Sequence, residues 1–149
     1  MFIAILLVIA GYVIGLGAVT VIDMHGFLGR KSAYWTEATT RTHKVTKPMI
    51  WVGTALALGA GAYLYNSLGQ QNALLFHVIT FVILIANGVF LSFSVSPFLL
   101  KREKEGRSAD LLPKSWQTKI TLSFIVSFLG WWSTLVMLAW TLASRIQIN

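Results

Sequence analysis

The histidines of this sequence are the side chains best suited to chemistry. The chain has three histidines and no cysteine, so disulfides, thiolate metal sites and cysteine nucleophiles are excluded. His25 and His43 flank a basic segment, and helical phase carried back through Pro48 would turn their rings toward each other. Neutral imidazoles ligate haem iron and other metals. The pair therefore predicts a haem b or metal site, and the alternative is two solvated histidines among lysines and arginines.

Two acidic residues lie close to these histidines. Asp23 precedes His25 by two residues, and Glu37 precedes His43 by six. A carboxylate near a ligating imidazole either orients the ring or becomes a further ligand. The candidate metal ligands are therefore Asp23, His25, Glu37 and His43.

His77 is the remaining candidate ligand. It lies in an apolar stretch, and Met137 lies at a similar depth in the following one. A histidine and a methionine together suit haem iron or copper. The alternative is a histidine at the water interface beside a packing methionine. The sequence has no Walker loop, nucleophile elbow, HExxH zinc motif or dinucleotide fingerprint, so enzyme classes that depend on those motifs are not indicated.

The apolar composition defines the elements that must position these side chains. Of the 149 residues, 56% are hydrophobic and only 11% are charged, whereas soluble domains carry roughly a quarter charged residues. A soluble globule of this size could not bury so much apolar surface. Each apolar stretch is close to the roughly 20 residues that a helix needs to cross a bilayer. The expected spans cover residues 2–22, 49–65, 73–100 and 120–143 of a single domain, 1–149.

The basic residues indicate how these spans are oriented. All but one of the 12 lysines and arginines fall in the connections 23–47 and 101–119. The positive-inside rule places both connections in the cytoplasm and both termini outside, in the cytoplasmic (inner) membrane of a bacterium. Contact with anionic lipid headgroups is the expected second role of the positive charge. Nucleic acid is not an expected partner.

Small and polar residues recur at three- and four-residue steps and predict the inner faces of the helices. Gly11 and Gly15 form a GxxxG pair, which lets two helices approach closely. Asn87 is expected to form a hydrogen bond between helices, with Ser127 or Thr134 of the fourth span. The predicted packing residues are Gly11, Gly15, Gly53, Ala57, Asn87, Ser127, Gly130 and Thr134. The expected fold is an all-α, antiparallel four-helix transmembrane bundle.

The connections and prolines give further expectations. Residues 32–44 predict a short amphipathic helix lying on the inner leaflet, with an irregular basic loop as the alternative. Pro48 suits the first turn of the second span. Pro97 predicts a kink or an early end of the third span. Residues 101–115 are expected to form a solvated loop.

Part of the first half of the chain is similar in sequence to a group of known proteins. The stretch GLGAVTVIDMHGFLGRKSAYWTEATTRTHKVTKPMIW, residues 15–51, resembles a group of small, uncharacterised bacterial proteins with four membrane spans. In size and topology the chain is also similar to CopD-type copper-resistance proteins and HemJ-type haem-pathway oxidases. HemJ-type proteins carry a histidine within the first span, whereas this chain has none before His25.

Three functions agree with these features. No Asp, Glu, Lys or Arg lies within the expected spans, which favours an accessory or interaction subunit that binds a membrane-protein partner or a second copy. One alternative is a redox protein that holds haem b or a metal. The other is a permease for a small molecule or a metal.

Overall fold

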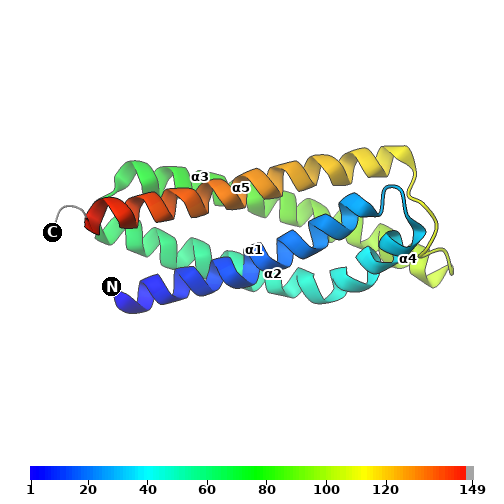
Figure 1. The fold of residues 1–149 in the computed structure, drawn as a ribbon, viewed down its shortest axis with the longest axis horizontal. Helices are drawn as coiled ribbons and strands as arrows, with labels where there is room; N and C mark the ends of the chain where they lie inside the picture. The colour runs from blue at the N-terminus through cyan, green and yellow to red at the C-terminus, as the bar shows by residue number, and fades with distance from the viewer. Residues whose placement is uncertain (147–149) are drawn as a thin grey trace.

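The fold is an all-α bundle of four antiparallel helical columns. The structure, a computed structural model, describes residues 1–146, and Figure 1 shows their arrangement. The elements are α1 (Phe2–Leu28), α2 (Ala33–Ser67), α3 (Gln71–Phe90), the π-helical segment η1 (Leu91–Val95), α4 (Ser96–Lys104) and α5 (Lys114–Ile146). The segments α3, η1 and α4 run on continuously and form the third column. The predicted fold class is confirmed.

All four columns are long and apolar enough to cross a membrane. The membrane-spanning candidates are Phe2–Leu28, Ala33–Ser67, Gln71–Lys104 and Lys114–Arg145, and each contains one of the predicted spans. The chain is thus built as a multi-pass membrane protein. The start of α1 and the end of α5 lie at one end of the bundle, and the two basic connections lie at the other (Figure 1).

The predicted interfacial helix is not a separate element. Residues 32–44 are helical from Ala33 onward, but they continue through Pro48 into the second span as one 35-residue helix. The Thr36 hydroxyl donates to the Gly29 carbonyl at 2.8 Å, which fastens the start of α2 to the end of α1. Lys47 is helical despite the local preference of the residue before a proline for extended backbone. Pro48 therefore lies inside α2 and not in its first turn.

The third column also remains helical through its proline, Pro97. The π-helical segment Leu91–Val95 shifts the hydrogen-bond register just before Pro97. Pro97 then falls in the first turn of α4, where its missing N–H leaves no helical bond unmade. The expected early end does not occur, because the change of register accommodates the ring and the column continues to Lys104.

Glycines bring α1 and α2 into close contact. A methyl group added at Gly11 would lie 2.5 Å from the Ala57 nitrogen, and one added at Gly53 would lie 2.8 Å from the Gly11 carbonyl oxygen. Gly15 lies between Gly53 and the Trp131 ring of α5. These positions have no room for a side chain, so the two helices pack backbone to backbone.

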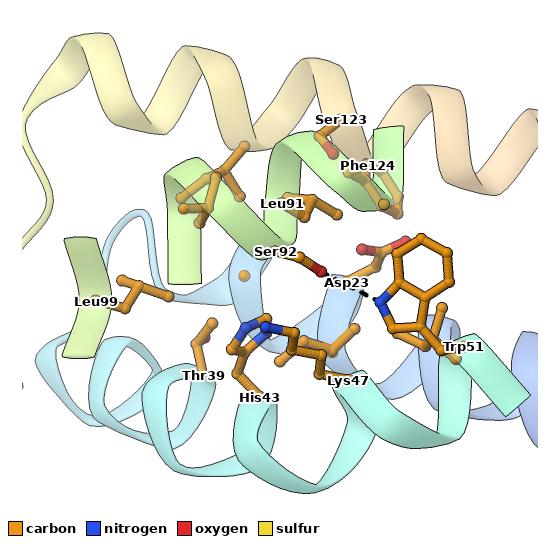
Figure 2. A pocket seen from close by; sticks show the side chains of 16 residues that line it. Asp23, Thr39, His43, Lys47, Trp51, Leu91, Ser92, Leu99, Ser123 and Phe124 are labelled. Atoms are coloured by element: carbon orange, nitrogen blue, oxygen red, sulfur yellow. Dashed lines mark hydrogen bonds between the residues drawn. The ribbon is translucent and has the colours of Figure 1, made fainter. Parts of the chain in front are cut away.

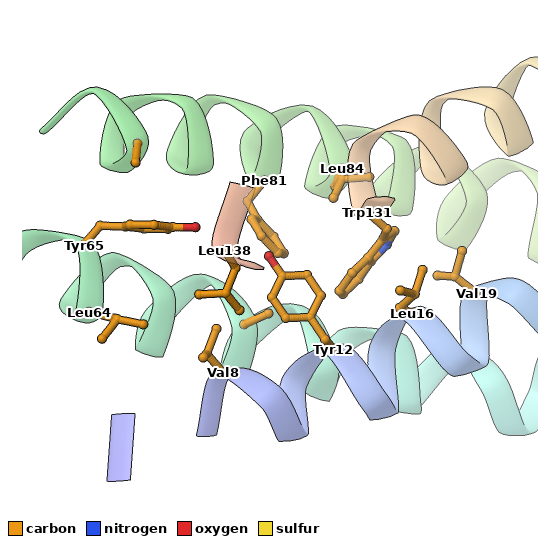
Figure 3. Packing of buried hydrophobic residues seen from close by; sticks show 12 residues of the cluster. Val8, Tyr12, Leu16, Val19, Leu64, Tyr65, Phe81, Leu84, Trp131 and Leu138 are labelled. Atoms are coloured by element: carbon orange, nitrogen blue, oxygen red, sulfur yellow. The ribbon is translucent and has the colours of Figure 1, made fainter. Parts of the chain in front are cut away.

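Aromatic rings fill the centre of the bundle. Trp131 is 2% exposed and meets the rings of Tyr12 and Phe81 edge to face, at centroid separations of 5.9 and 5.5 Å. Figure 3 shows these side chains converging from α1, α3 and α5, with Leu138 beside them. Trp132, the next residue, is exposed on the outer face. The core therefore resembles that of a soluble bundle in packing, although its surroundings are apolar.

Asn87 joins α3 to α5. Its amide nitrogen donates to the Ser127 hydroxyl at 2.9 Å and to the Ser123 carbonyl at 3.1 Å. The Ser123 hydroxyl returns a hydrogen bond to the Asn87 amide oxygen at 2.7 Å. Thr134, the other partner considered for Asn87, donates instead to carbonyls of its own helix. The Asn87 side-chain amide thus uses both of its N–H donors and its oxygen acceptor in bonds to α5, and these bonds fix the axial register of α3 against α5.

Residues 105–113 of the second basic connection form a mostly exposed loop as predicted, whereas residues 101–104 belong to α4 and residues 114–115 belong to α5. The Arg102 guanidinium is buried and donates to the Asp110 carbonyl at 2.8 Å, which folds the connection back onto α4. Lys44 of α2 pairs with Glu103 of α4 at 2.8 Å. Glu105 accepts hydrogen bonds from Arg107, which holds the pKa of the Glu105 carboxyl below its ordinary value.

Candidate functional site

A cavity lies between all four columns in the half of the bundle near the basic connections. It has a volume of about 80 Å³, and Figure 2 shows its lining. The lining residues of α1 and α2 are Ile22, Asp23, Gly26, Thr39, His43, Lys47, Ile50 and Trp51. Those of the other columns are Gly88, Leu91, Ser92, Val95, Leu99, Ile120, Ser123 and Phe124. The wall is mainly apolar, with a few polar groups that converge on it.

Two polar atoms of this wall have no partner. The Asp23 Oδ2 and His43 Nε2 atoms are buried and form no hydrogen bond with any residue in the range 1–146. An unsatisfied buried polar group costs about 1–3 kcal/mol, and a charged one costs more. The neighbouring pair, Trp51 and Ser92, is satisfied because the indole N–H donates to the Ser92 hydroxyl at 3.3 Å. Asp23 and His43 are therefore the groups that a ligand would satisfy.

Lys47 supplies the third ionisable group. It is one helical turn beyond His43, so both side chains lie on the same face of α2. Among residues 1–146 its ammonium group forms no ion pair. The largely apolar lining of the cavity thus includes a carboxyl from α1 and an imidazole and an amine from α2 (Figure 2).

A second cavity adjoins the first. Its volume is about 40 Å³, and Asp23, Trp51 and Leu91 line both spaces. It extends toward the centre of the bundle, where Asn87 and Trp131 line it. Asp23 therefore borders two neighbouring cavities, one near the basic end and one beside the aromatic core.

Both helical irregularities occur at the level of the cavity. Pro48 follows Lys47 directly, and it cannot donate to the carbonyl four residues earlier in α2. In the third column, η1 provides Leu91, Ser92 and Val95 to the wall. π-helical segments within α-helices are frequent at functional sites. The walls on these two sides are thus the parts of the bundle where the regular helical hydrogen bonding is interrupted.

The predicted four-residue metal site does not assemble. No group of three or more His, Cys, Asp or Glu side chains suited to a metal ion occurs within residues 1–146. Asp23 and His43 share the cavity, but the His25 ring packs against Trp35 at a centroid separation of 5.1 Å. Glu37 pairs with Arg41 at 2.5 Å on the surface. The continuous helix explains this result, because six residues rotate Glu37 by about 240° from His43.

His77 is a core residue and not an interfacial one. It is 1% exposed and lies between the rings of Tyr65 and Phe81. Its Nε2 atom lies 3.1 Å from the Ala57 carbonyl oxygen, which can only accept, so Nε2 carries the proton. A methyl group at Gly61 would lie 2.5 Å from the same nitrogen. Nε2 is therefore unavailable as a ligand for iron.

The cavity also does not fit a haem. Pockets for drug-sized ligands measure about 300–1,000 Å³, and the space beside His43 is about 80 Å³. Met137, the predicted partner of His77, is half-buried and packs against the hydrophobic core. The predicted haem ligands thus fall in different places: His77 and Met137 belong to the packed core, whereas His43 lines the small cavity.

Sequence reasoning missed the cavity because it ended the first span at residue 22. A signal was nevertheless present in the second helix. Thr39, His43, Lys47 and Trp51 recur at steps of four residues, and all four line the cavity. That spacing defines one face only if the helix continues through Pro48.

An apolar cavity with a few converging polar groups, enclosed by the helices of a bundle, is a common form of small-molecule site. Comparisons of the chain with protein-family models, with curated proteins and with solved structures find no match.

Proposed function

We propose that this protein binds a small organic molecule in the cavity between its four columns. The molecule has an apolar body of a few carbons and a head group that donates hydrogen bonds, such as an amine or an alcohol. The observation that carries this proposal is that two residues lining the cavity, Asp23 of α1 and His43 of α2, each have a buried, unpartnered atom, Oδ2 and Nε2. A function as a membrane carrier or permease agrees with the interrupted helices on either side of the site.

The chemistry of the wall determines the ligand class. A carboxylate is an acceptor, so Asp23 requires a donor, and a neutral imidazole nitrogen either accepts or donates. The aliphatic and aromatic residues around them, among them Ile50, Leu91 and Phe124, favour an apolar body. A molecule without a donor would leave the Asp23 carboxylate oxygen unsatisfied, and it would therefore bind more weakly.

The test is a titration of the purified full-length chain followed by Trp51 fluorescence. The probes are n-butylamine, n-butanol and methyl propyl ether, which have the same number of non-hydrogen atoms. We expect the amine and the alcohol to bind at least tenfold more tightly than the ether, which corresponds to about 1.4 kcal/mol for the missing donor. The Trp51→Phe variant identifies the part of the signal that arises at the cavity.

Asp23→Asn and Asp110→Asn form the matched pair of variants. The first alters the cavity, whereas the Asp110 side chain is exposed in the second connection. Only Asp23→Asn is expected to reduce the preference for the amine. Equal binding of the ether and the amine by the unmodified chain would contradict the proposed function.

A second candidate function, association with another copy in the membrane, is supported by a groove between α1 and α2. The groove is lined in part by Ala4, Ala55, Gly59 and Ala60, and the space above Gly59 is open. Small residues in such a groove allow a further helix to approach closely. Since the chain has no cysteine, the Gly59→Cys variant tests this directly. Oxidation is expected to give a covalent dimer from it but not from Val82→Cys on the outer face of α3.

A further inference from the structure

A groove on the outer surface, separate from the cavity, lies between the end of α1 and the start of α5. Its volume is about 510 Å³. Arg30 and Lys114 line its polar part, and Leu122 and Ile125 line its apolar part. Among the described residues that border it, none is acidic, and none belongs to the lining of the internal cavity. The groove therefore combines positive charge at one end with an apolar floor at the other.

Arg30 is held in position for an anion. Its Nε atom donates to the Phe27 carbonyl at 3.2 Å, and its guanidinium carbon lies 3.9 Å from the centre of the Phe27 ring. Two contacts to one residue restrict a side chain that would otherwise be flexible. The terminal nitrogens form no ion pair within residues 1–146. They remain free to donate to two oxygens of one phosphate.

Along α5, the residues that line the groove change from charged to apolar in the same order as the parts of a phospholipid, from headgroup to acyl chain. Lys114 begins the helix, the hydroxyls of Thr118 and Thr121 follow, and the exposed side chains of Leu122 and Ile125 come last. Eleven residues separate Lys114 from Ile125, which corresponds to about 16 Å of helix. A phosphate bound beside Lys114 would therefore have its acyl chain over the apolar floor.

We infer that this groove binds one anionic phospholipid, with its phosphate between Arg30 and Lys114 and an acyl chain along Leu122 and Ile125. The charge of the groove is complementary to the headgroup, and the apolar floor distinguishes a lipid from a free phosphate ion. Basic pockets at the ends of transmembrane helices take such headgroups. This lipid would bridge α1 and α5 at the basic end of the bundle.

The experiment is native mass spectrometry of the purified full-length chain, titrated with dioleoyl phosphatidylglycerol or dioleoyl phosphatidylcholine. We expect the unmodified chain to bind one phosphatidylglycerol in preference to phosphatidylcholine. Each basic residue at an anionic surface contributes a factor of about five in affinity. The Arg30→Gln/Lys114→Gln variant should therefore lose about 25-fold in affinity, whereas Arg30→Lys should retain most of it.

The matched control is Lys101→Gln/Lys104→Gln, which removes the same charge from exposed positions of α4. An equal loss in both double variants would show a general effect of charge and would overturn the site. Displacement of the lipid by inorganic phosphate at millimolar concentration would show that the groove holds an ion alone, and would also overturn it. Unchanged melting temperatures in all variants are expected, because these basic side chains lie at the surface.

Discussion

At the scale of single residues, the polar side chains inside this bundle fall into two groups. Asn87, and His77 through its Nε2 atom, have partners of fixed geometry and join elements of the core. The buried atoms without a partner among residues 1–146 are the Tyr12 and Tyr65 hydroxyls, Nδ1 of His25 and of His77, Asp23 Oδ2 and His43 Nε2. An unsatisfied polar group lowers the stability of the native state, and among these residues only Asp23 and His43 line the cavity, where a ligand could satisfy them.

Replacement of Asp23 should separate stability from binding. The Asp23→Leu variant has a side chain of similar size and no unsatisfied oxygen, so we expect the free energy of unfolding to rise by about 1–3 kcal/mol. The same variant should lose its preference for n-butylamine over methyl propyl ether. Thermal melting in detergent and the fluorescence titration measure the two effects. A lower melting temperature would show that Asp23 has a stabilising partner.

The small residue opposite His77 should also be sensitive to substitution. In Gly61→Ala the new methyl group would meet the imidazole at about 2.5 Å, so the ring must move away from the Ala57 carbonyl. Overpacking of this kind costs about 1–3 kcal/mol. Gly69→Ala is an unsuitable control because its φ of 67° favours glycine, whereas Gly59→Ala adds a methyl group in open space. We expect thermal melting to show a loss for Gly61→Ala alone.

At the scale of elements, the sequence was sufficient to locate the four columns but not their irregularities. Hydropathy over some 20 residues locates a span regardless of local detail. The continuity of α2 through Pro48 runs against the local preference of the residue before a proline, so the local sequence does not predict it. The π-helical register before Pro97 likewise has no local sequence signature. The cavity escaped prediction for the same reason, since it lies where these two features meet.

The close packing of α1 on α2 can be tested within one helix. Gly11→Ile would force a side chain against the Ala57 backbone, whereas Gly17→Ile places the same side chain where nothing lies within 4 Å. We expect Gly11→Ile to lower the free energy of unfolding toward the upper part of the roughly 1–3 kcal/mol range for overpacking. Gly17→Ile should change it by about 0.5 kcal/mol or less. Similar melting temperatures for the two variants would contradict the contact.

The interrupted hydrogen bonding of α2 gives a second prediction for this scale. Pro48→Ala restores an N–H to the helix interior, so we expect the bundle to gain up to about 3 kcal/mol in stability. If flexibility at Pro48 admits the ligand, n-butylamine should also bind and dissociate more slowly. Stopped-flow fluorescence measures these rates. Pro113→Ala, which changes the connection before α5, serves as the control and should leave the rates unaltered.

At the scale of the whole molecule, the positions of the lysines and arginines agree with the antiparallel arrangement of the helices. The structure places both basic connections at one end of the bundle, and the start of α1 and the end of α5 at the other (Figure 1). We propose that the basic end faces the cytoplasm, because lysines and arginines are retained on that side. The cavity, which lies in the same half, would then be nearer to the cytoplasm than to the opposite surface.

Reporter fusions test this orientation. A reporter active only outside the cytoplasm should give a signal when fused to the C-terminus, and a reporter active only in the cytoplasm should not. Fusions within the second connection, at Gly106 for example, should give the reverse pattern. Since Gly106 lies in an exposed turn with φ 69°, insertion there should leave the helices intact. The opposite result in both positions would invert the proposed topology.

The glycine contacts between α1 and α2 have a consequence for the order in which the chain is assembled. Gly11, Gly15, Gly53 and Ala57 all lie within the first two helices, which end at Ser67. Asn87, in contrast, finds its partners only in α5. We expect the first helical hairpin to pack in the membrane while the ribosome is still synthesising the second. Insertion of the second hairpin would then complete the bundle and enclose the cavity.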